Sequence, residues 1–176
     1  MERWDKKGIP HKGWKFEYIV DYEDDYAQCE MCGKEGVRFI HILSHPKYGE
    51  IRVGCDCACK MLNDYVNPQQ REKDFKNKIS RLKTFLNIQW RYNPEKNTYS
   101  TRYKGEYITI IKSKYGNFGV AFQQEIIWDF NGNKVRDLET AKRWAFEVFD
   151  EKHKTLKERN LSRVFGGRNW DDWIDD

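Results

Sequence analysis

The sequence predicts an α+β protein with a zinc module, a linking helix and an antiparallel meander packed on one long helix. All five cysteines fall between positions 29 and 59. Short runs with alternating apolar residues, separated by turn residues, follow position 88, and an amphipathic stretch begins at position 138. Aromatic residues make up 15% of the chain. Because they bury large areas, we expect a folded protein even though 34% of the residues are charged.

The chain has no sequence feature of a membrane protein or an exported protein. No apolar run approaches the roughly 18 residues that suggest a membrane-spanning helix. Its start, Met1-Glu2-Arg3-Trp4-Asp5, lacks the pattern of a signal peptide. We therefore expect a soluble, cytoplasmic protein.

The five cysteines predict a metal site. An odd, clustered set in a chain without a signal peptide favours metal binding over a disulfide framework. Cys29, Cys32 and the following glycine have the spacing of a zinc knuckle. We expect one structural zinc ion, bound by the knuckle pair and by Cys55 and Cys57. Cys59 is either a spectator or an alternative to Cys55.

The segments around the cysteines predict a treble-clef-like module over residues 1–66. Two strands, 37–42 and 50–53, are joined by a turn at 44–49. A short helix at 58–65 then follows. A knuckle, a hairpin and a helix that starts near the second ligand pair make up the treble-clef layout.

A basic amphipathic helix is predicted over the linking segment 67–89. Asn67 can cap it and Pro68 suits its first position. The apolar residues recur at helical spacing, and they are Phe75, Ile79, Leu82 and Leu86. Most basic residues lie off this stripe, where they form either a solvated face or a track for phosphates.

Residues 90–159 predict a domain with a β-meander and one long helix. The expected strands are 88–92, 98–103, 107–112, 118–122 and 126–130. Asp137 is expected to cap a helix over 138–158. The residues expected on its inner face are Leu138, Ala141, Trp144, Ala145, Val148 and Phe149.

Charge and aromatic content make nucleic acid, either DNA or RNA, the expected partner of this middle region. Residues 66–159 carry 20 basic and 12 acidic side chains, a net charge of +8. Aromatic residues between the basic ones could stack on bases, although a half-buried sheet needs some of them in its core. Tyr92, Tyr99, Tyr103 and Tyr107 are such aromatic candidates. The nucleic-acid-binding candidates are Lys76, Arg81, Lys83, Trp90, Arg91, Arg102, Lys104, Lys112 and Lys114.

Two resemblances support these expectations. Residues 115–122 and 137–146 are similar to three-strand-plus-helix nucleic-acid-binding domains of the ethylene-response-factor type, which read DNA with their sheet. Residues 10–150 resemble an uncharacterised family of small bacterial and phage proteins, which implies a phage, mobile-element or defence context. That resemblance implies ligands at positions 29, 32, 55 and 57, with Cys59 outside the pattern. Its motifs are His11-Lys-Gly-Trp14, Cys29-x-x-Cys32, Arg38-Phe-Ile-His41, His45-Pro46, Val53-Gly-Cys-x-Cys57-Ala58, Asp64-Tyr65, Arg71-Glu72, Trp90-Arg91, Ala141-Lys142 and Ala145-Phe146.

Two other functions are compatible with the sequence. A hairpin and helix around zinc is also the scaffold of His-Asn-His nucleases, which makes His41 and His45 weak catalytic candidates. The residue before each histidine, Ile40 or Ser44, is not the acidic one usual in those nucleases. A protein-interaction or inhibitor module that acts on a partner protein is the second alternative. We expect no catalytic role.

The last segment, residues 160–176, predicts an acidic-aromatic tail. Four carboxylates surround Trp170 and Trp173. Indole rings are unfavourable in water, so we expect them to dock on a partner protein or on the basic surface of this chain.

Overall fold

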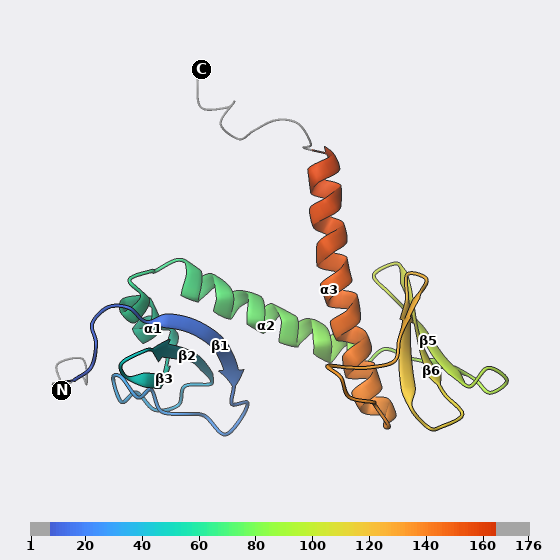
Figure 1. The fold of residues 1–176 in the computed structure, drawn as a ribbon, viewed down its shortest axis with the longest axis horizontal. Helices are drawn as coiled ribbons and strands as arrows, with labels where there is room; N and C mark the ends of the chain where they lie inside the picture. The colour runs from blue at the N-terminus through green and yellow to red at the C-terminus, as the bar shows by residue number, and fades with distance from the viewer. Residues whose placement is uncertain (1–7, 165–176) are drawn as a thin grey trace, which may run out of the picture. The chain divides into compact units, whose positions relative to one another are not determined.

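The computed structural model describes the backbone of residues 8–164 and the side chains of residues 8–154 (Figure 1). Over these residues the fold is mixed α and β, with three helices and two antiparallel sheets. The chain divides into two compact units, Met1–Ser80 and Arg81–Asp176. We call them the N-terminal and C-terminal units, and the boundary falls inside helix α2 (Asn67–Leu86).

The N-terminal unit contains a three-stranded sheet and a short helix. β1 (Lys15–Asp21), β2 (Phe39–His45) and β3 (Gly49–Val53) are ordered β1-β2-β3, and α1 (Cys55–Leu62) follows β3 after one residue. The predicted hairpin is confirmed. β2 runs on to His45, which pairs with Gly49, so the turn is shorter than expected. The core is built from apolar side chains of this sheet, of α1 and of the segments next to them, which include Trp14, Leu43, Ile51, Val53 and Met61.

The sequence pattern did not predict β1. Its pairing with β2 shifts register between Phe16 and Tyr18. Such a bulge places consecutive residues on the same face, so the strict alternation that marks a strand is broken. The half-buried and exposed positions of β1 accordingly do not alternate.

The starts of α1 and α2 differ from the prediction. α1 begins earlier than expected, and α2 is capped by a different residue. α1 starts at Cys55, because Gly54 is extended and serves as its N-cap. It ends where Asn63 adopts a left-handed conformation with φ of 52°. At the start of α2, Oδ1 of Asp64 accepts hydrogen bonds from the backbone N–H groups of Val66 and Asn67. Asp64, and not Asn67 as expected, supplies the capping oxygen.

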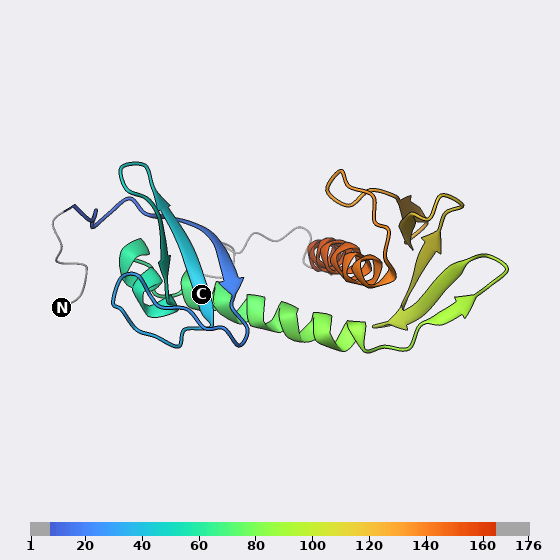
Figure 2. The same cartoon turned by 90° about the horizontal axis from the view of Figure 1, so that it is seen from below.

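The C-terminal unit is a five-stranded meander with one long helix. The strands are β4 (Arg91–Asn93), β5 (Thr98–Tyr103), β6 (Glu106–Lys112), β7 (Phe118–Phe122) and β8 (Glu125–Ile127), in sequential order. α3 (Leu138–Val164) packs against β6 and β7 (Figure 2). The five predicted strands are confirmed, with shifts of a few residues at some ends.

The start of α3 and its inner face agree with the prediction. The backbone N–H of Thr140 donates to Oδ1 of Asp137 over 2.7 Å, which confirms the expected cap. Ala141, Trp144 and Phe149 are buried in the core of this unit. The helix continues six residues beyond the predicted end at 158. At the end of α2, Phe85 is fully buried, whereas the predicted stripe passed through Leu86.

Among the described helices, none combines the length and the apolar composition that a membrane-spanning helix requires.

Candidate metal centre and candidate nucleic-acid interface

The first candidate metal-binding group lies where the loop after β1 meets the start of α1. A bridge between Ala27 and Val37 closes this loop. Inside it, the N–H of Gly33 donates to the carbonyl oxygen of Cys29 over 2.8 Å, and Gly33 has a φ of 77°. That left-handed conformation strains residues other than glycine. The turn holds Cys29 and Cys32 on one short loop.

Cys57 completes this group. The sulfur atoms of Cys29, Cys32 and Cys57 all lie within 4.8 Å of one another. Cys29 and Cys57 are buried and Cys32 is exposed. Three thiol groups at this spacing could hold a metal ion. We call them the three-cysteine group.

Hydrogen bonds favour the thiolate of Cys29. The neighbouring Cys57 thiol and the backbone N–H groups of Cys32, Gly54 and Met31 lower the pKa of Cys29 well below its ordinary value. The Gly54 N–H lies 3.4 Å from the Cys29 sulfur. The pKa of Cys57 is raised, because Cys29 holds its proton in a hydrogen bond and because it is buried. These contacts favour the thiolate, which is the form of cysteine that binds metals.

A second group brings together three different donor types. His41 from β2, Cys55 from α1 and Glu72 from α2 each offer one ligand atom, and these atoms lie within 4.8 Å of one another. His41 is fully buried, Cys55 is half-buried and the Glu72 side chain is 15% exposed. We call them the His-Cys-Glu group, and it too could hold a metal ion.

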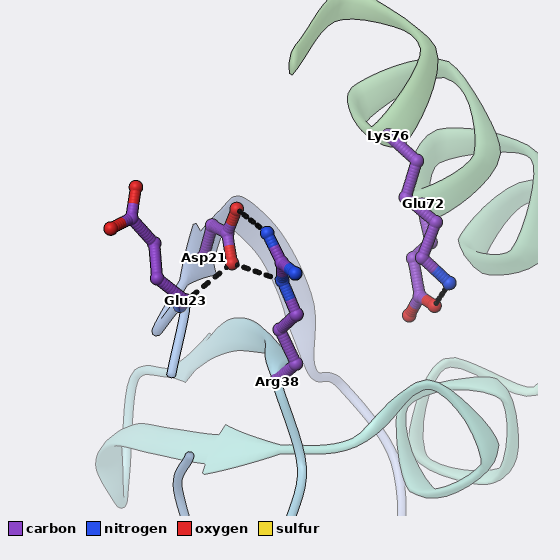
Figure 3. Close-up of polar contacts among 5 residues, drawn as sticks. All are labelled: Asp21, Glu23, Arg38, Glu72 and Lys76. Carbon is purple, nitrogen blue, oxygen red and sulfur yellow. Dashed lines mark hydrogen bonds and ion pairs between the residues drawn. The ribbon is translucent and has the colours of Figure 1, made fainter. Parts of the chain in front are cut away.

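Glu72 is the centre of a short chain of polar contacts. Its Oε2 lies 3.0 Å from Nε2 of His41. Its Oε1 accepts a hydrogen bond of 2.6 Å from Nζ of Lys76 (Figure 3). These two partners lower the pKa of Glu72 to about 2. Burial, together with the negative charge of Glu72, raises the pKa of Cys55 to about 12. Nδ1 of His41 has no hydrogen-bond partner among the described residues.

A cavity of about 320 Å³ borders both candidate metal-binding groups. Arg38 lies in its wall and is fixed by Asp21, whose two carboxylate oxygens accept hydrogen bonds of 2.8 and 3.0 Å (Figure 3). This ion pair raises the pKa of Arg38. The cavity is lined by residues of both groups, including Cys29, Cys32, Cys55, Cys57 and Glu72.

The structure brings together three of the four predicted zinc ligands. Cys55 lies two residues before Cys57 on α1, yet it belongs to the His-Cys-Glu group. Cys59 is buried next to Cys55 and belongs to neither group. Glu72 was not a predicted site residue, since a carboxylate that is 31 residues from its histidine partner leaves no local pattern.

His45, the other histidine of β2, has a structural environment. Its Nδ1 accepts a hydrogen bond from the Lys47 N–H, so its Nε2 carries the proton and donates to the carbonyl oxygen of Lys12. Its ring also packs on Trp14 at 5.2 Å. His45 belongs to neither candidate metal-binding group.

The second candidate site is the face of the five-stranded sheet opposite α3. Ile108, Ile110 and Val120 point to the core beneath α3, so their strand neighbours point the other way. Within the described part of the C-terminal unit, α3 covers one face of the sheet and no helix covers the outer face (Figure 2). The register aligns its central row across all five strands, as Arg91, Ser100, Thr109, Ala121 and Ile126.

Cationic and aromatic side chains share this outer face. Arg102 lies over the ring of Tyr107 at 5.5 Å, and Tyr107 is 70% exposed. Trp128 lies over Gly119, where a Cβ would approach its ring to 2.7 Å. No strand position that points outward carries an aspartate or glutamate in the described sheet. The face therefore combines two arginines and two aromatic rings without a carboxylate.

The predicted nucleic-acid-binding residues divide into exposed residues and residues with structural contacts. Arg81 forms an ion pair with Asp150, and Lys76 is bound by Glu72. Trp90 packs on the core of the C-terminal unit. Arg91 and Arg102 lie on the outer face. The other four are exposed away from the centre of that face, and they are Lys83, Lys104, Lys112 and Lys114.

The aromatic candidates divide in the same way. Tyr99 packs on the core and Tyr103 is buried in it. Tyr92 pairs with Tyr99, so it shares the inner face. Of the four tyrosines, Tyr107 alone lies on the outer face. Trp128 was missed, because it follows the last strand and only the contact with Gly119 brings it over the sheet.

The predicted partner-binding residues Trp170 and Trp173 lie outside the described residues, as does most of the predicted tail. Comparison with protein-family models finds no matching family, and searches of curated proteins and of solved structures find no match.

Proposed function

We propose that this protein is a zinc-stabilised, non-catalytic protein that binds single-stranded nucleic acid. The outer face of the C-terminal sheet carries this proposal, because it presents Arg91, Arg102, Tyr107 and Trp128 without a carboxylate. Arginines attract phosphates, and exposed rings stack on unpaired bases. A sheet face with both is how several single-strand-binding folds hold their ligand.

The charge distribution also supports an anionic ligand. Arg91 lies at one side of the sheet, and Arg102 and Tyr107 lie on the next two strands along the same face. A pocket beside them is lined by Arg91, Ser100, Arg102 and Tyr107. Hydroxyl groups of Ser100 and Thr109, which hydrogen-bond to each other over 3.1 Å, lie in the central row. All these groups can contact phosphate or base edges, and none of them repels phosphate.

In the N-terminal unit, we propose that the ion of the three-cysteine group is a structural zinc. Zinc prefers thiolate ligands in a tetrahedral arrangement. The ion would join the loop after β1 to the start of α1, in the manner of a treble clef. It would stabilise a sheet of only three strands, which is a small core for a unit of this size. The three cysteine sulfur atoms would fill three of the four tetrahedral positions, and a ligand from outside the three-cysteine group would fill the fourth.

Fluorescence anisotropy of the full chain with labelled oligonucleotides tests the nucleic-acid proposal. Single-stranded DNA, single-stranded RNA and duplex DNA are compared at two salt concentrations. We expect single strands to bind more tightly than the duplex, and we expect the double variant Arg91→Met, Arg102→Met to lose this binding. Arg143→Met is the matched control, because Arg143 lies on α3, which covers the opposite face of the sheet.

Three results would overturn the proposal. Absence of binding at low salt would favour a protein-interaction module. A loss of log affinity in Arg143→Met that is half the loss in the double variant would mean that only net charge is recognised, because the control removes one charge and the double variant removes two. Cleavage of the oligonucleotide with magnesium, abolished by His41→Ala, would favour the nuclease alternative.

A further inference from the structure

We propose that His41, Cys55 and Glu72 bind a second metal ion, separate from the zinc of the three-cysteine group. The basis is the meeting of an imidazole, a thiol and a carboxylate from three different elements, with one ligand atom of each within 4.8 Å of the others. This site goes beyond the proposed function, which needs only the three-cysteine group and the outer face of the sheet.

The backbone positions these three donors independently. His41 pairs with Val53 in the hairpin of β2 and β3. Cys55 is the first residue of α1, two residues after that hairpin ends. Glu72 is on the second turn of α2 and reaches back over β2, where its carboxylate meets Nε2 of His41 at 3.0 Å. Three donors from three elements form a site that depends on the tertiary fold of this unit.

The donor types select the class of metal. Imidazole and thiolate favour zinc and other borderline transition metals, whereas magnesium and calcium prefer oxygen ligands alone. Nitrogen, sulfur and one carboxylate oxygen are all established zinc ligands. We therefore expect zinc or a similar divalent ion, with cobalt(II) as a spectroscopic substitute.

Two openings give the site access to solvent. Cys55 and Glu72 both line the cavity of about 320 Å³ that also contains Arg38 and Phe39. They line a second opening of about 300 Å³ with Gln69 and Lys73. His41 lines neither and is fully buried. Three protein ligands and a solvent-facing side leave one tetrahedral position for water or an added ligand, as in zinc sites that are not purely structural.

One observation is unexplained by packing alone. His41 is fully buried, and its Nδ1 has no hydrogen-bond partner among the described residues. A buried polar atom without a hydrogen-bond partner destabilises the folded state. Its other nitrogen faces Glu72, so the ring already has one fixed polar contact. A metal ion bound to Nδ1 would give this atom its missing partner and would explain why a histidine occupies this buried position.

Two simpler arrangements compete with this proposal. In the first, His41, Glu72 and Lys76 form a hydrogen-bonded chain that only fastens α2 to β2, and Cys55 is an incidental neighbour. In the second, Cys55 moves to the three-cysteine group and completes a single four-thiolate site, as the sequence alone suggested. Each arrangement predicts one ion per chain, whereas the present proposal predicts two.

Metal analysis of the purified full chain, combined with native mass spectrometry, decides between one ion and two. We expect two zinc ions in the unaltered protein and one in each of Cys55→Ser and Glu72→Gln. Cys59→Ser is the matched control for Cys55→Ser, because Cys59 lies next to Cys55 on the same helix and belongs to neither group. This control should retain both ions.

Cobalt substitution shows which ion is lost. Thiolate-to-cobalt charge-transfer absorption grows with the number of thiolates, so the three-cysteine group dominates that absorption. We expect Cys55→Ser to keep most of it and to lose the weaker contribution of the second ion. One ion in the unaltered protein, or two in Glu72→Gln, would overturn the proposal. A large loss of charge-transfer absorption in Cys55→Ser would assign Cys55 to the three-cysteine group instead.

The circular dichroism spectrum of each variant checks that loss of metal is not a loss of fold. A variant that loses the second ion should keep the helical signal of the unaltered chain.

Anisotropy with single-stranded DNA separates this proposal from the proposed function, since the outer face lies in the C-terminal unit. If Glu72→Gln keeps two ions while the unaltered chain still binds single strands, only the second metal site is wrong.

Discussion

Arg81 and Asp150 form an ion pair inside the C-terminal unit, in which Nη1 of the arginine donates to Oδ1 of the aspartate. Asp150 is only 3% exposed. Its other oxygen, Oδ2, lies 3.4 Å from Nζ of Lys154. The pair joins the last turns of α2 to α3, and the Arg81 guanidinium lies 5.9 Å from the ring of Phe146. A basic residue that a charge count assigns to nucleic acid is therefore part of the fold.

Arg81→Met should destabilise the C-terminal unit by about 2 kcal/mol, because it leaves a buried carboxylate with one exposed lysine as its partner. We expect urea unfolding to show this loss. Lys83→Met is the control, since Lys83 is exposed on the same helix end, and it should leave stability unchanged. Equal stability of the two variants would mean that Lys154 replaces Arg81 completely.

Asp137 makes the stability of α3 depend on pH. The backbone N–H of Thr140 donates to its carboxylate and lowers the pKa of Asp137 below its ordinary value of 3.8. This stabilisation is therefore fully present above pH 3.8 and is lost as the pH falls through the lower pKa of the folded state. Asp137→Asn keeps an oxygen that can cap the helix but has no charge to lose.

Thermal unfolding of the two proteins across this range measures the effect. The melting temperature of the unaltered protein should fall relative to that of Asp137→Asn as the pH drops below 3.8. Asp137→Ala should melt earlier than both at neutral pH, because it removes the capping oxygen. Parallel curves for the unaltered protein and Asp137→Asn would show that the charge of Asp137 does not contribute.

The C-terminal fold was predictable because its signals are local. Turn residues separate its strands, and Asp137 together with the apolar spacing after it defines the start of α3. β1 was not predictable in the same way, since the register shift between Phe16 and Tyr18 removes the alternation. Phe85 replaces Leu86 in the core because tertiary packing sets the rotation of the last turn of α2.

The candidate metal centre was predictable only in part. The spacing of Cys29 and Cys32 before Gly33 indicates a knuckle by itself. The sequence could not separate Cys55 from Cys57, because two positions on one helical turn can point to different neighbours. Glu72 joins His41 through the packing of α2 on β2, and that contact leaves no trace in the spacing of residues.

Gly119 and Trp128 should be energetically coupled. A Cβ at position 119 would lie 2.7 Å from the Trp128 ring, so Gly119→Ala must displace the indole. We expect a loss of about 1–3 kcal/mol from this overpacking. In Gly119→Ala, Trp128→Ala, the methyl group meets no indole, so the double variant should be more stable than the sum of the single losses predicts. Strict additivity in urea unfolding would show that the indole does not rest on Gly119.

The two kinds of outer-face residue should affect nucleic-acid binding differently. Arg91→Met or Arg102→Met should reduce the slope of log affinity against log salt by about one, because one phosphate contact is lost. Tyr107→Ala should weaken binding by about 1–3 kcal/mol with the slope unchanged, as expected for loss of one stacked base. Anisotropy titrations at several salt concentrations give both quantities. A changed slope in Tyr107→Ala would assign its effect to Arg102, which lies over its ring.

Cys32→Ser should remove the ion of the three-cysteine group and unfold the N-terminal unit. Structural zinc contributes on the order of 10 kcal/mol or more to the folding of small modules, and the three-stranded sheet of this unit cannot replace that amount. The C-terminal unit has its own core around Phe146 and Phe149, so we expect its signals in a two-dimensional NMR spectrum to persist. Cys59→Ser should keep both the metal and the spectrum, because Cys59 belongs to neither candidate group. If Cys32→Ser keeps its zinc and its N-terminal signals, the ion is held without the knuckle, and the structural role proposed for the three-cysteine group is wrong.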